Sequence, residues 1–310
     1  MTAWLAYRGE AADAPRGDAL DLRDDAAYRG WRAIKLAHRP TDAAELTVDI
    51  VDPRRLGEAE ARALRRTISR CSMALYRSPV LDDDPALARR LGEQLGLRRL
   101  DANWLAEEDG LSRIEVSGRR DASAGKAGYI PCSTHAIRWH TDGYYHPDER
   151  RIHALQLHCV RPAASGGVNR LLDHELAYIA LRDESPHLVR ALMRPDAMTI
   201  PARHDDDGRV ARAAQRGPVL CVEGGRLHLR YTARTRSIEW HADADVQAAA
   251  AFLASWLDSS PPGQLTVRLE AGMGLIGHNV LHDRSAFVDD PASPRLLFRA
   301  RWRDRIAGDD

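Results

Sequence analysis

The strongest constraint on the fold comes from residues 296–302, close to the C-terminus. Apolar residues occupy the even positions of this run, and arginine occupies most of the odd ones, at Arg299 and Arg301. This period of two predicts a β-strand with one face in a hydrophobic core and guanidinium groups on the other. Because a guanidinium donates two parallel hydrogen bonds to a carboxylate, the charged face could bind one. A solvated row of arginines is the alternative.

Short β-like runs separated by turn residues dominate the rest of the chain. Expected strands cover residues 33–36, 46–51, 73–76, 137–145, 152–160, 265–269, 274–279 and 296–302, with a hairpin over 219–231. Expected helices cover residues 57–72, 86–95, 185–193 and 243–257. The pattern predicts a mainly β fold with helical insertions (α+β), a sandwich or barrel of the jelly-roll kind.

Length and composition favour one globular domain over residues 1–310. Hydrophobic residues make up 44% of the chain and charged residues 29%, which is typical of a protein with a packed core. No Pro/Gly/Ser-rich linker divides the sequence. We expect residues 1–56 to form an N-terminal extension that packs on the domain, and residues from about 175 to 260 to form a helical and hairpin insertion. Residues around 200–215 are a candidate lid.

Charge and hydropathy argue against several classes of partner. The chain has 45 basic and 45 acidic residues, so a general nucleic-acid-binding role has no electrostatic support. No apolar run approaches the roughly 20 residues that cross a membrane, and the N-terminus does not resemble a secretory signal. The four cysteines are far apart in the sequence, which fits a reducing cytoplasm better than a disulfide scaffold.

The tripeptide His140-Thr141-Asp142 is the first candidate for chemistry. In a strand, residues i and i+2 face the same way, so the imidazole and the carboxylate would converge. One imidazole and one carboxylate make two thirds of the triad that holds non-haem Fe(II). His282 could be the distant third ligand, with His278 as a nearby alternative. By itself the tripeptide is equally compatible with an ordinary polar pair.

The order of His140, Asp142, His282, Arg295 and Arg299 resembles the taurine dioxygenase-like (TauD/TfdA) family of Fe(II)- and 2-oxoglutarate-dependent oxygenases. The likeness extends over roughly residues 61–301. It includes the helix near residues 86–96, the strand and Gly-Gly turn at 154–169 and, more loosely, residues 230–239. The resemblance implies a double-stranded β-helix (jelly-roll) core and, because family members are frequently dimers or tetramers, allows a homo-oligomer.

The resemblance also implies roles for individual residues. His140, Asp142 and His282 would bind Fe(II), and Arg295 would bind the C5 carboxylate of 2-oxoglutarate. Asn169 stands where the family usually has a threonine that helps to bind 2-oxoglutarate, and an amide can still donate a hydrogen bond there. Arg299 would contact an acidic group of the substrate. His282 is preferred to His278 as the ligand because it is the histidine that precedes the arginine pattern.

Further pocket residues are expected on either side of the metal motif. Tyr144 has the strand parity of His140 and Asp142, so it could face the site. The other candidates are Trp139, Tyr145 and His146 beside the motif, and Arg230, Arg234 and Arg236 from the later hairpin. Packing in the core or on the surface is the alternative for each aromatic residue.

We therefore expect a dioxygenase that uses O2 to hydroxylate a small anionic metabolite, with release of succinate and CO2. One alternative keeps the cofactors but ends in desaturation or cyclisation; halogenation is disfavoured because Asp142 fills the position that a halide would need. A non-catalytic jelly-roll binding protein is an alternative of another class. A zinc hydrolase could use the same three ligands, but it has no use for a carboxylate clamp at Arg295.

Overall fold

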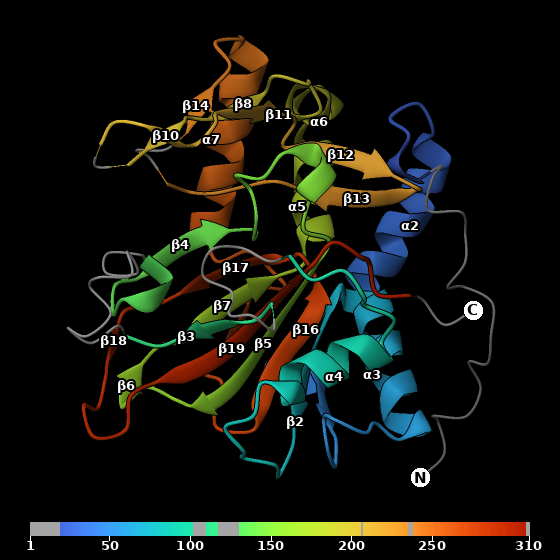
Figure 1. The fold of residues 1–310 in the computed structure, drawn as a ribbon. Coiled ribbons are helices and arrows are strands. Elements are labelled where there is room, and N and C mark those ends of the chain that lie inside the picture. The colour runs from blue at the N-terminus through green and yellow to red at the C-terminus, as the bar shows by residue number, and fades with distance from the viewer. Residues whose placement is uncertain (1–18, 102–109, 117–129, 206, 235–237, 308–310) are drawn as a thin grey trace, which may run out of the picture.

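The computed structural model describes residues 19–101, 110–116, 130–205, 207–234 and 238–307. Within these residues, two β-sheets lie next to each other, helices cover one face of the larger sheet, and a further group of helices and small sheets lies beyond the smaller one (Figure 1). The fold is of the mixed α+β kind, as the sequence predicts.

The larger sheet has the strand order β1-β2-β16-β5-β19-β3. Its strands are β1 (Thr47–Asp49), β2 (Met73–Arg77), β16 (Met273–His278), β5 (Ala154–Arg161), β19 (Leu296–Trp302) and β3 (Ser112–Ile114). Only β1 and β2 pair in parallel, and the other neighbours are antiparallel. Because β19 is paired on both sides, the side on which each of its residues points is fixed.

The smaller sheet carries the strands of the metal motif. Its order is β15-β7-β17-β4, with every neighbouring pair antiparallel. The strands are β15 (Leu265–Val267), β7 (Asn169–Leu172), β17 (Leu281–Arg284) and β4 (Ile137–His140). A short pair, β6 (Ser165–Gly166) with β18 (Phe287–Val288), continues from the ends of β5 and β17.

The alternation in β19 places its residues in two different environments. Leu297 lies in a hydrophobic cluster to which both sheets contribute, with Leu157 of β5 and Leu171 of β7. Phe298 and Trp302 lie in another cluster, formed with α3 (Glu58–Cys71) and α4 (Ala86–Gln94) on the outer face of the larger sheet. Side chains of the parity of Leu297, which include the arginines, therefore point towards the smaller sheet.

Residues 174–258, between β7 and β15, pack around a separate hydrophobic cluster. The helices are α5 (His174–Glu184), α6 (Pro186–Leu192) and α7 (Ala244–Asp258). The strands are β8 (Met198–Ile200), β9 (Arg203–His204), β10 (Val210–Arg212), β11 (Gln215–Gly217), β12 (Leu220–Glu223), β13 (Arg226–Leu229) and β14 (Glu239–Trp240). They form the small sheets β11-β8-β14, β12-β13 and β10-β9.

The N-terminal helix α2 (Asp25–Ala37) packs against α5. The hydroxyl of Tyr28 donates to Asp183 over 2.7 Å, and the guanidinium of Arg182 lies 3.9 Å from the centre of the Tyr28 ring. Short 3-10 helices are η1 (Ala43–Leu46), η3 (Ile130–Cys132) and η4 (Asp148–Arg150). Among the described residues, no helix has the length and apolar character needed to cross a membrane.

Most of the predicted helices and strands are confirmed, with two clear corrections. Residues 33–36, expected as a strand, belong to α2, which begins at the N-cap Asp24 and is held by ion pairs of Lys35 with Asp173 and Glu175. The strand expected over 137–145 ends at His140, and Gly143 then adopts a φ of 68° within a turn. The parity argument for Tyr144 therefore does not apply.

Close packing of α4 on the larger sheet generates a stability prediction. A Cβ at Gly92 of α4 would lie 2.6 Å from the buried ring of Trp302, which is too close for any real contact. We expect Gly92→Ala to lower the free energy of unfolding by about 1–3 kcal/mol, despite the better helix propensity of alanine. Urea unfolding followed by circular dichroism measures the change.

Gly30 in α2 provides the matched control. A Cβ there meets nothing within 4 Å, so Gly30→Ala should raise the free energy of unfolding by about 0.5–1 kcal/mol. Equal effects of the two substitutions would contradict the packing of α4 against Trp302.

Candidate metal centre

Three side chains from the smaller sheet and the turn after β4 converge on one point. His140 ends β4 and stands directly opposite His282 of the antiparallel strand β17. Their ring centres are 4.2 Å apart, and His140 Nε2 lies 3.8 Å from Asp142 Oδ1. One ligand atom from each of the three residues lies within 4.8 Å of the others. The structure thus brings together the three ligands that the sequence predicts.

Backbone contacts leave the same ring nitrogen free in both histidines. Nδ1 of His140 lies 2.9 Å from the carbonyl oxygen of Arg138, and Nδ1 of His282 lies 3.0 Å from that of Val280. A carbonyl only accepts, so each Nδ1 carries the proton and each Nε2 keeps a lone pair. Two imidazole nitrogens and a carboxylate suit a non-haem iron.

Asp142 is held through its backbone, and its carboxylate stays available. Its N–H donates to Asn279 Oδ1 over 2.8 Å, and Asn279 Nδ2 donates back to the Asp142 carbonyl over 2.7 Å. The carboxylate is buried, Oδ2 has no hydrogen-bond partner among the described residues, and Oδ1 lies 3.5 Å from Arg299 Nη1. An orphaned buried carboxylate oxygen is what a metal ligand requires.

Burial and neighbouring charges keep these groups in the forms that bind metal. Burial, assisted by the adjacent His282, lowers the pKa of His140 to about 3, so the imidazole is neutral at physiological pH. Burial raises the pKa of Asp142, but Arg299 and Arg301 outweigh it and hold the pKa below its ordinary value. A neutral imidazole and an ionised carboxylate need not lose a proton before they bind a metal.

Arg295 is a buried cation whose guanidinium forms no ion pair with a carboxylate of the described residues. It is 5% exposed and precedes β19, where its guanidinium lies 5.0 Å from the centre of the Phe287 ring. Arg284 lies over the same ring at 4.8 Å, but it donates to three backbone carbonyls. Among the described residues, no hydrogen bond or ion pair satisfies the Arg295 guanidinium. Burial lowers its pKa, and the nearby Cys159 and Asp289 offset this only in part.

Asn169 lies at the start of β7, and only the nitrogen of its side-chain amide is hydrogen-bonded to a described residue. Its Nδ2 donates to the backbone carbonyl of Asp283 over 2.9 Å, whereas its Oδ1 has no partner among the described residues. One of the two amide hydrogens therefore remains free to donate.

The other predicted substrate-binding residues lie in different surroundings. Arg299 touches Asp142, and Tyr144 and Arg234 contact each other at 3.4 Å through the phenol and guanidinium. Trp139 is 2% exposed and packs in the cluster of residues 174–258, on the face of β4 opposite His140. Its placement gives no support to a substrate contact.

The later arginines differ from their expected roles as well. Arg230 donates to five backbone carbonyls and is 7% exposed, so it holds the hairpin together and has no donor set left for an anion. Arg236 lies outside the described residues.

Sequence reasoning missed two contributors to the site. Asn279 holds the backbone of Asp142, a role that the sequence does not indicate. Arg301, noted only as part of the charged strand face, pairs with Asp101 Oδ2 at 2.6 Å and donates to the Tyr145 hydroxyl over 2.8 Å. No local pattern marks these contacts, because their partners are remote in the sequence.

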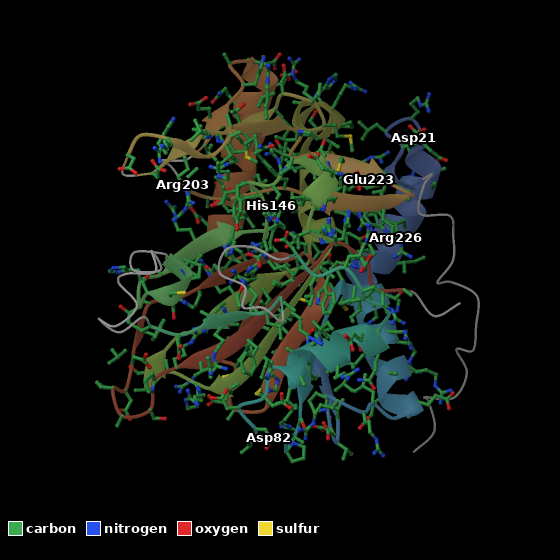
Figure 2. The ribbon with its side chains drawn as sticks, viewed as in Figure 1. Asp21, Asp82, His146, Arg203, Glu223 and Arg226 are labelled. Carbon is green, nitrogen blue, oxygen red and sulfur yellow. The ribbon has the colours of Figure 1, made fainter. Side chains whose placement is uncertain are left out.

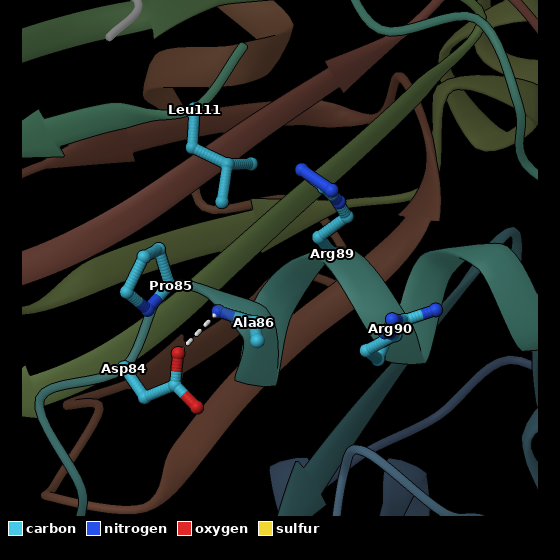
Figure 3. Close-up of a pocket in the computed structure, with 6 residues that line it drawn as sticks. All are labelled: Asp84, Pro85, Ala86, Arg89, Arg90 and Leu111. Carbon is cyan, nitrogen blue, oxygen red and sulfur yellow. Dashed lines mark hydrogen bonds between the residues drawn. The ribbon is translucent and has the colours of Figure 1, made fainter. Parts of the chain in front are cut away.

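A cavity of about 200 Å³ at the start of α4 is separate from this site (Figure 3). Asp84 Oδ1 accepts a hydrogen bond from Ala86 N there over 2.9 Å, and Arg89 and Arg90 both pair with Glu93. α4 covers the outer face of the larger sheet, whereas Arg299 meets Asp142 on the inner face. The cavity is therefore not the pocket of the triad.

Residues 35–301 match the profile of the taurine catabolism dioxygenase TauD, TfdA family. The chain belongs to this family. It is therefore an Fe(II)- and 2-oxoglutarate-dependent non-haem iron oxygenase with an HxD...H metal-binding triad. The zinc hydrolase and the non-catalytic binding protein are set aside by this result.

Individual TauD/TfdA relatives agree with the assignment. A uridine-5'-phosphate dioxygenase from Streptomyces sp is 36% identical over 170 residues, which are 52% of this chain and 60% of that protein. The chain thus matches less than two thirds of the relative's length.

Solved structures share the fold of this TauD/TfdA member. The non-haem iron oxygenase OrfP with Fe and α-ketoglutaric acid matches with a TM-score of 0.58 and 20% identity, over 94% of this chain and 91% of that one. Asparagine oxygenase with Fe(II), 3-hydroxyasparagine and succinate matches with a TM-score of 0.54 and 16% identity, over 87% and 90%. AAD-2 with Mn(II) and N-oxalylglycine matches with a TM-score of 0.56 and 16% identity, over 85% and 95%.

The buried His140 predicts a loss of stability on mild acidification of the metal-free protein. Its pKa is near 6.5 in the unfolded chain and about 3 in the folded protein. Between these values the unfolded chain binds a proton that the folded protein excludes, so the free energy of unfolding falls as the pH drops below 6.5. From pH 7 to pH 5 we expect His140 to contribute a loss of about 2 kcal/mol.

Urea unfolding with a chelator, at both pH values, tests this expectation. His140→Ala should lack this part of the pH dependence, whereas buried histidines remote from the triad, such as His158, affect both proteins equally. Identical slopes for the wild type and the variant would contradict a neutral, buried His140.

Proposed function

We propose that this oxygenase hydroxylates a small anionic metabolite with release of succinate and CO2, and that the substrate is a nucleoside 5'-monophosphate such as uridine 5'-phosphate. One observation carries the anionic class: Arg299, 7% exposed, lies beside Asp142 with its Nε unpartnered among the described residues. The activity named for the Streptomyces relative supports the choice of nucleotide.

In this proposal, His140, Asp142 and His282 bind Fe(II). The free Nε2 atoms and the orphaned Oδ2 of Asp142 form a donor set that fits this metal. When bound, the Fe(II) centre supplies the coupled oxidation of 2-oxoglutarate to succinate and CO2 and of a substrate C–H bond by O2. Asn279 keeps Asp142 in place for this role, through two hydrogen bonds to its backbone.

Arg295 would hold the far carboxylate of 2-oxoglutarate. Its guanidinium is buried, stacked on Phe287 and unpaired with any described carboxylate. A buried cation without a counter-ion gains most from a ligand carboxylate, because the partner restores the lost solvation. Asn169, with one free amide hydrogen, is proposed to donate to the same co-substrate.

Arg299 would hold the anion of the primary substrate. The metal balances the charge of Asp142, so the guanidinium of Arg299 keeps a positive charge for the substrate. Tyr144 and Arg234, which contact each other, are proposed to border the same pocket. Trp139 is not part of the proposed substrate pocket, because it is buried on the opposite face of β4.

We further propose that the two sheets are the two halves of a double-stranded β-helix core, with residues 1–310 as one domain. Residues 1–56 would then be the N-terminal extension, and residues from about 175 to 260 the insertion. The shared cluster of Leu157, Leu171 and Leu297 supports the first statement, and the insertion of α5–α7 between β7 and β15 supports the last.

The cofactor site is tested by anaerobic titration of the apoprotein with Fe(II) and 2-oxoglutarate. The wild type should develop the visible metal-to-ligand charge-transfer band of the chelated complex. His282→Ala should lose it, because a metal ligand is removed. Arg295→Ala should need at least tenfold more 2-oxoglutarate for half-saturation, because a charge-assisted contact is lost.

His278→Ala is the matched control for the band. His278 is buried, like His282, but it ends β16 and does not join the triad. A band that survives in His282→Ala and disappears in His278→Ala would reverse the ligand assignment.

Substrate class is tested by measuring succinate formed with uridine 5'-phosphate, uridine and taurine. We expect turnover with the nucleotide and little with uridine, because the neutral nucleoside cannot pair with Arg299. Arg299→Gln should raise the KM for uridine 5'-phosphate about tenfold or more. A normal charge-transfer band without nucleotide-dependent succinate would reject the substrate and leave the cofactors intact.

Product mass separates the reaction outcomes. Hydroxylation adds one oxygen atom, whereas desaturation or cyclisation removes two hydrogen atoms. Free phosphate is measured too, because a hydroxyl on the carbon bearing the ester gives a hemiacetal phosphate that eliminates phosphate.

A further inference from the structure

The inward face of β19 continues past Arg299 to a buried polar chain that the proposed reaction does not use. Arg301 is 2% exposed, donates through Nη2 to Asp101 Oδ2 over 2.6 Å and through Nη1 to the Tyr145 hydroxyl over 2.8 Å. Asp101 also accepts from Arg150 Nη2 over 2.7 Å and lies 3.0 Å from His146 Nε2. Both terminal nitrogens of Arg301 therefore hold its neighbours, whereas its Nε has no hydrogen-bond partner among the described residues.

The turn after Asp142 determines where Tyr145 lies. Gly143 has a φ of 68°, and the N–H of His146 donates to its carbonyl over 2.8 Å. A Cβ at Gly143 would come within 2.4 Å of Ile152, so only glycine allows so tight a turn. The turn directs Tyr145 back towards β19, where it meets Arg301. Figure 2 labels His146, the residue that follows Tyr145.

The hydroxyl proton of Tyr145 has no hydrogen-bond acceptor among the described residues. Arginine has only donors, so the phenol oxygen must accept the bond from Arg301. Its own O–H has no acceptor among the described residues. Arg299 Nε has no acceptor either. The Tyr145 hydroxyl and Arg299 Nε are thus two donors without acceptors among the described residues, and Arg301, two residues from Arg299 on β19, holds the phenol.

Arg299 and Arg301 lie on the same face of β19, about 7 Å apart along the strand. Arg299 reaches Asp142, and Arg301 reaches Tyr145, so the phenol lies close enough to Arg299 and Asp142 to interact with their charges. Burial raises the pKa of Tyr145, but Arg301 and Arg299 outweigh it, and the net shift is downward. A more acidic phenol donates a stronger hydrogen bond to an anion.

We propose that Tyr145 is a specificity-determining residue whose hydroxyl, together with Arg299 Nε, binds one oxyanion of the substrate. Arg301 and Asp101 act as positioning residues that hold the phenol oxygen and turn its proton towards the ligand. A pair of donors beside a positive charge favours a phosphate, sulfonate or carboxylate over a neutral hydroxyl. The inference rests on the proposed function, in which the substrate carries an anion at Arg299.

Isothermal titration of the anaerobic Fe(II)- and 2-oxoglutarate-loaded protein tests the proposal, with inorganic phosphate and uridine 5'-phosphate as probes. Tyr145→Phe removes only the hydroxyl and should weaken the binding of both probes about tenfold, because a hydrogen bond to a charged group is lost. The 2-oxoglutarate concentration that half-saturates the charge-transfer band should not change. If Tyr145 had only a structural role, Tyr145→Phe would weaken the binding of 2-oxoglutarate, as measured by the charge-transfer band, as well as the binding of the anions.

Tyr28→Phe is the matched control. It also removes a tyrosine hydroxyl with one strong partner, Asp183, but at the contact of α2 with α5. Its phosphate and nucleotide affinities should equal those of the wild type. If Tyr145→Phe does not fold, Arg301→Lys replaces it, because lysine keeps the charge beside Asp101 but loses the fork that also holds the phenol.

Each outcome is decisive. Unchanged affinity for both probes in folded Tyr145→Phe overturns the proposal, and so does a wild type that binds neither probe. Phosphate binding that weakens in Tyr145→Phe, without nucleotide-dependent succinate in the wild type, supports the role of Tyr145 while rejecting uridine 5'-phosphate as the substrate.

Discussion

The site depends on the pairing of β4 with β17. This antiparallel register places His140 opposite His282, close enough for their rings to meet. Because side chains alternate along a strand, a slip by one residue would turn one imidazole to the other side of the sheet and destroy the metal site. Asp142 follows from the same pairing, since Asn279, two residues before β17, holds its backbone. Metal binding is therefore a property of the sheet rather than of the tripeptide.

The second constraint is the row of arginines buried between the sheets. Buried cations are costly unless each has an anion or a set of carbonyls. Arg301 has Asp101 and Arg299 faces Asp142, whereas Arg295 has no partner among the described residues. The buried arginines therefore differ in how many of their donors are occupied: both terminal nitrogens of Arg301 are bound, whereas the Arg295 guanidinium has no hydrogen bond among the described residues. In the proposed function, this difference separates residues that position others from residues that bind co-substrate and substrate.

The family assignment and the substrate depend on different parts of the molecule. The metal-binding triad accounts for the chemistry shared with other TauD/TfdA members. The turn containing Gly143 supplies Tyr145, which meets Arg301 on the strand face that also carries Arg299. Solved structures with identities of only 20% and 16% share the fold.

The sequence by itself determined the features that short periods encode: the two faces of β19, the boundaries of α3 and α4, and the order of metal ligands and arginines. Each depends on residues only a few positions apart, or on a resemblance of motifs. Tertiary structure alone decided that Trp139 packs in the core, that the strand ends at His140, and that Tyr145 meets Arg301. Contacts such as Arg301 with Asp101, 200 residues apart, leave no local period, because chain folding, and not sequence spacing, brings them together.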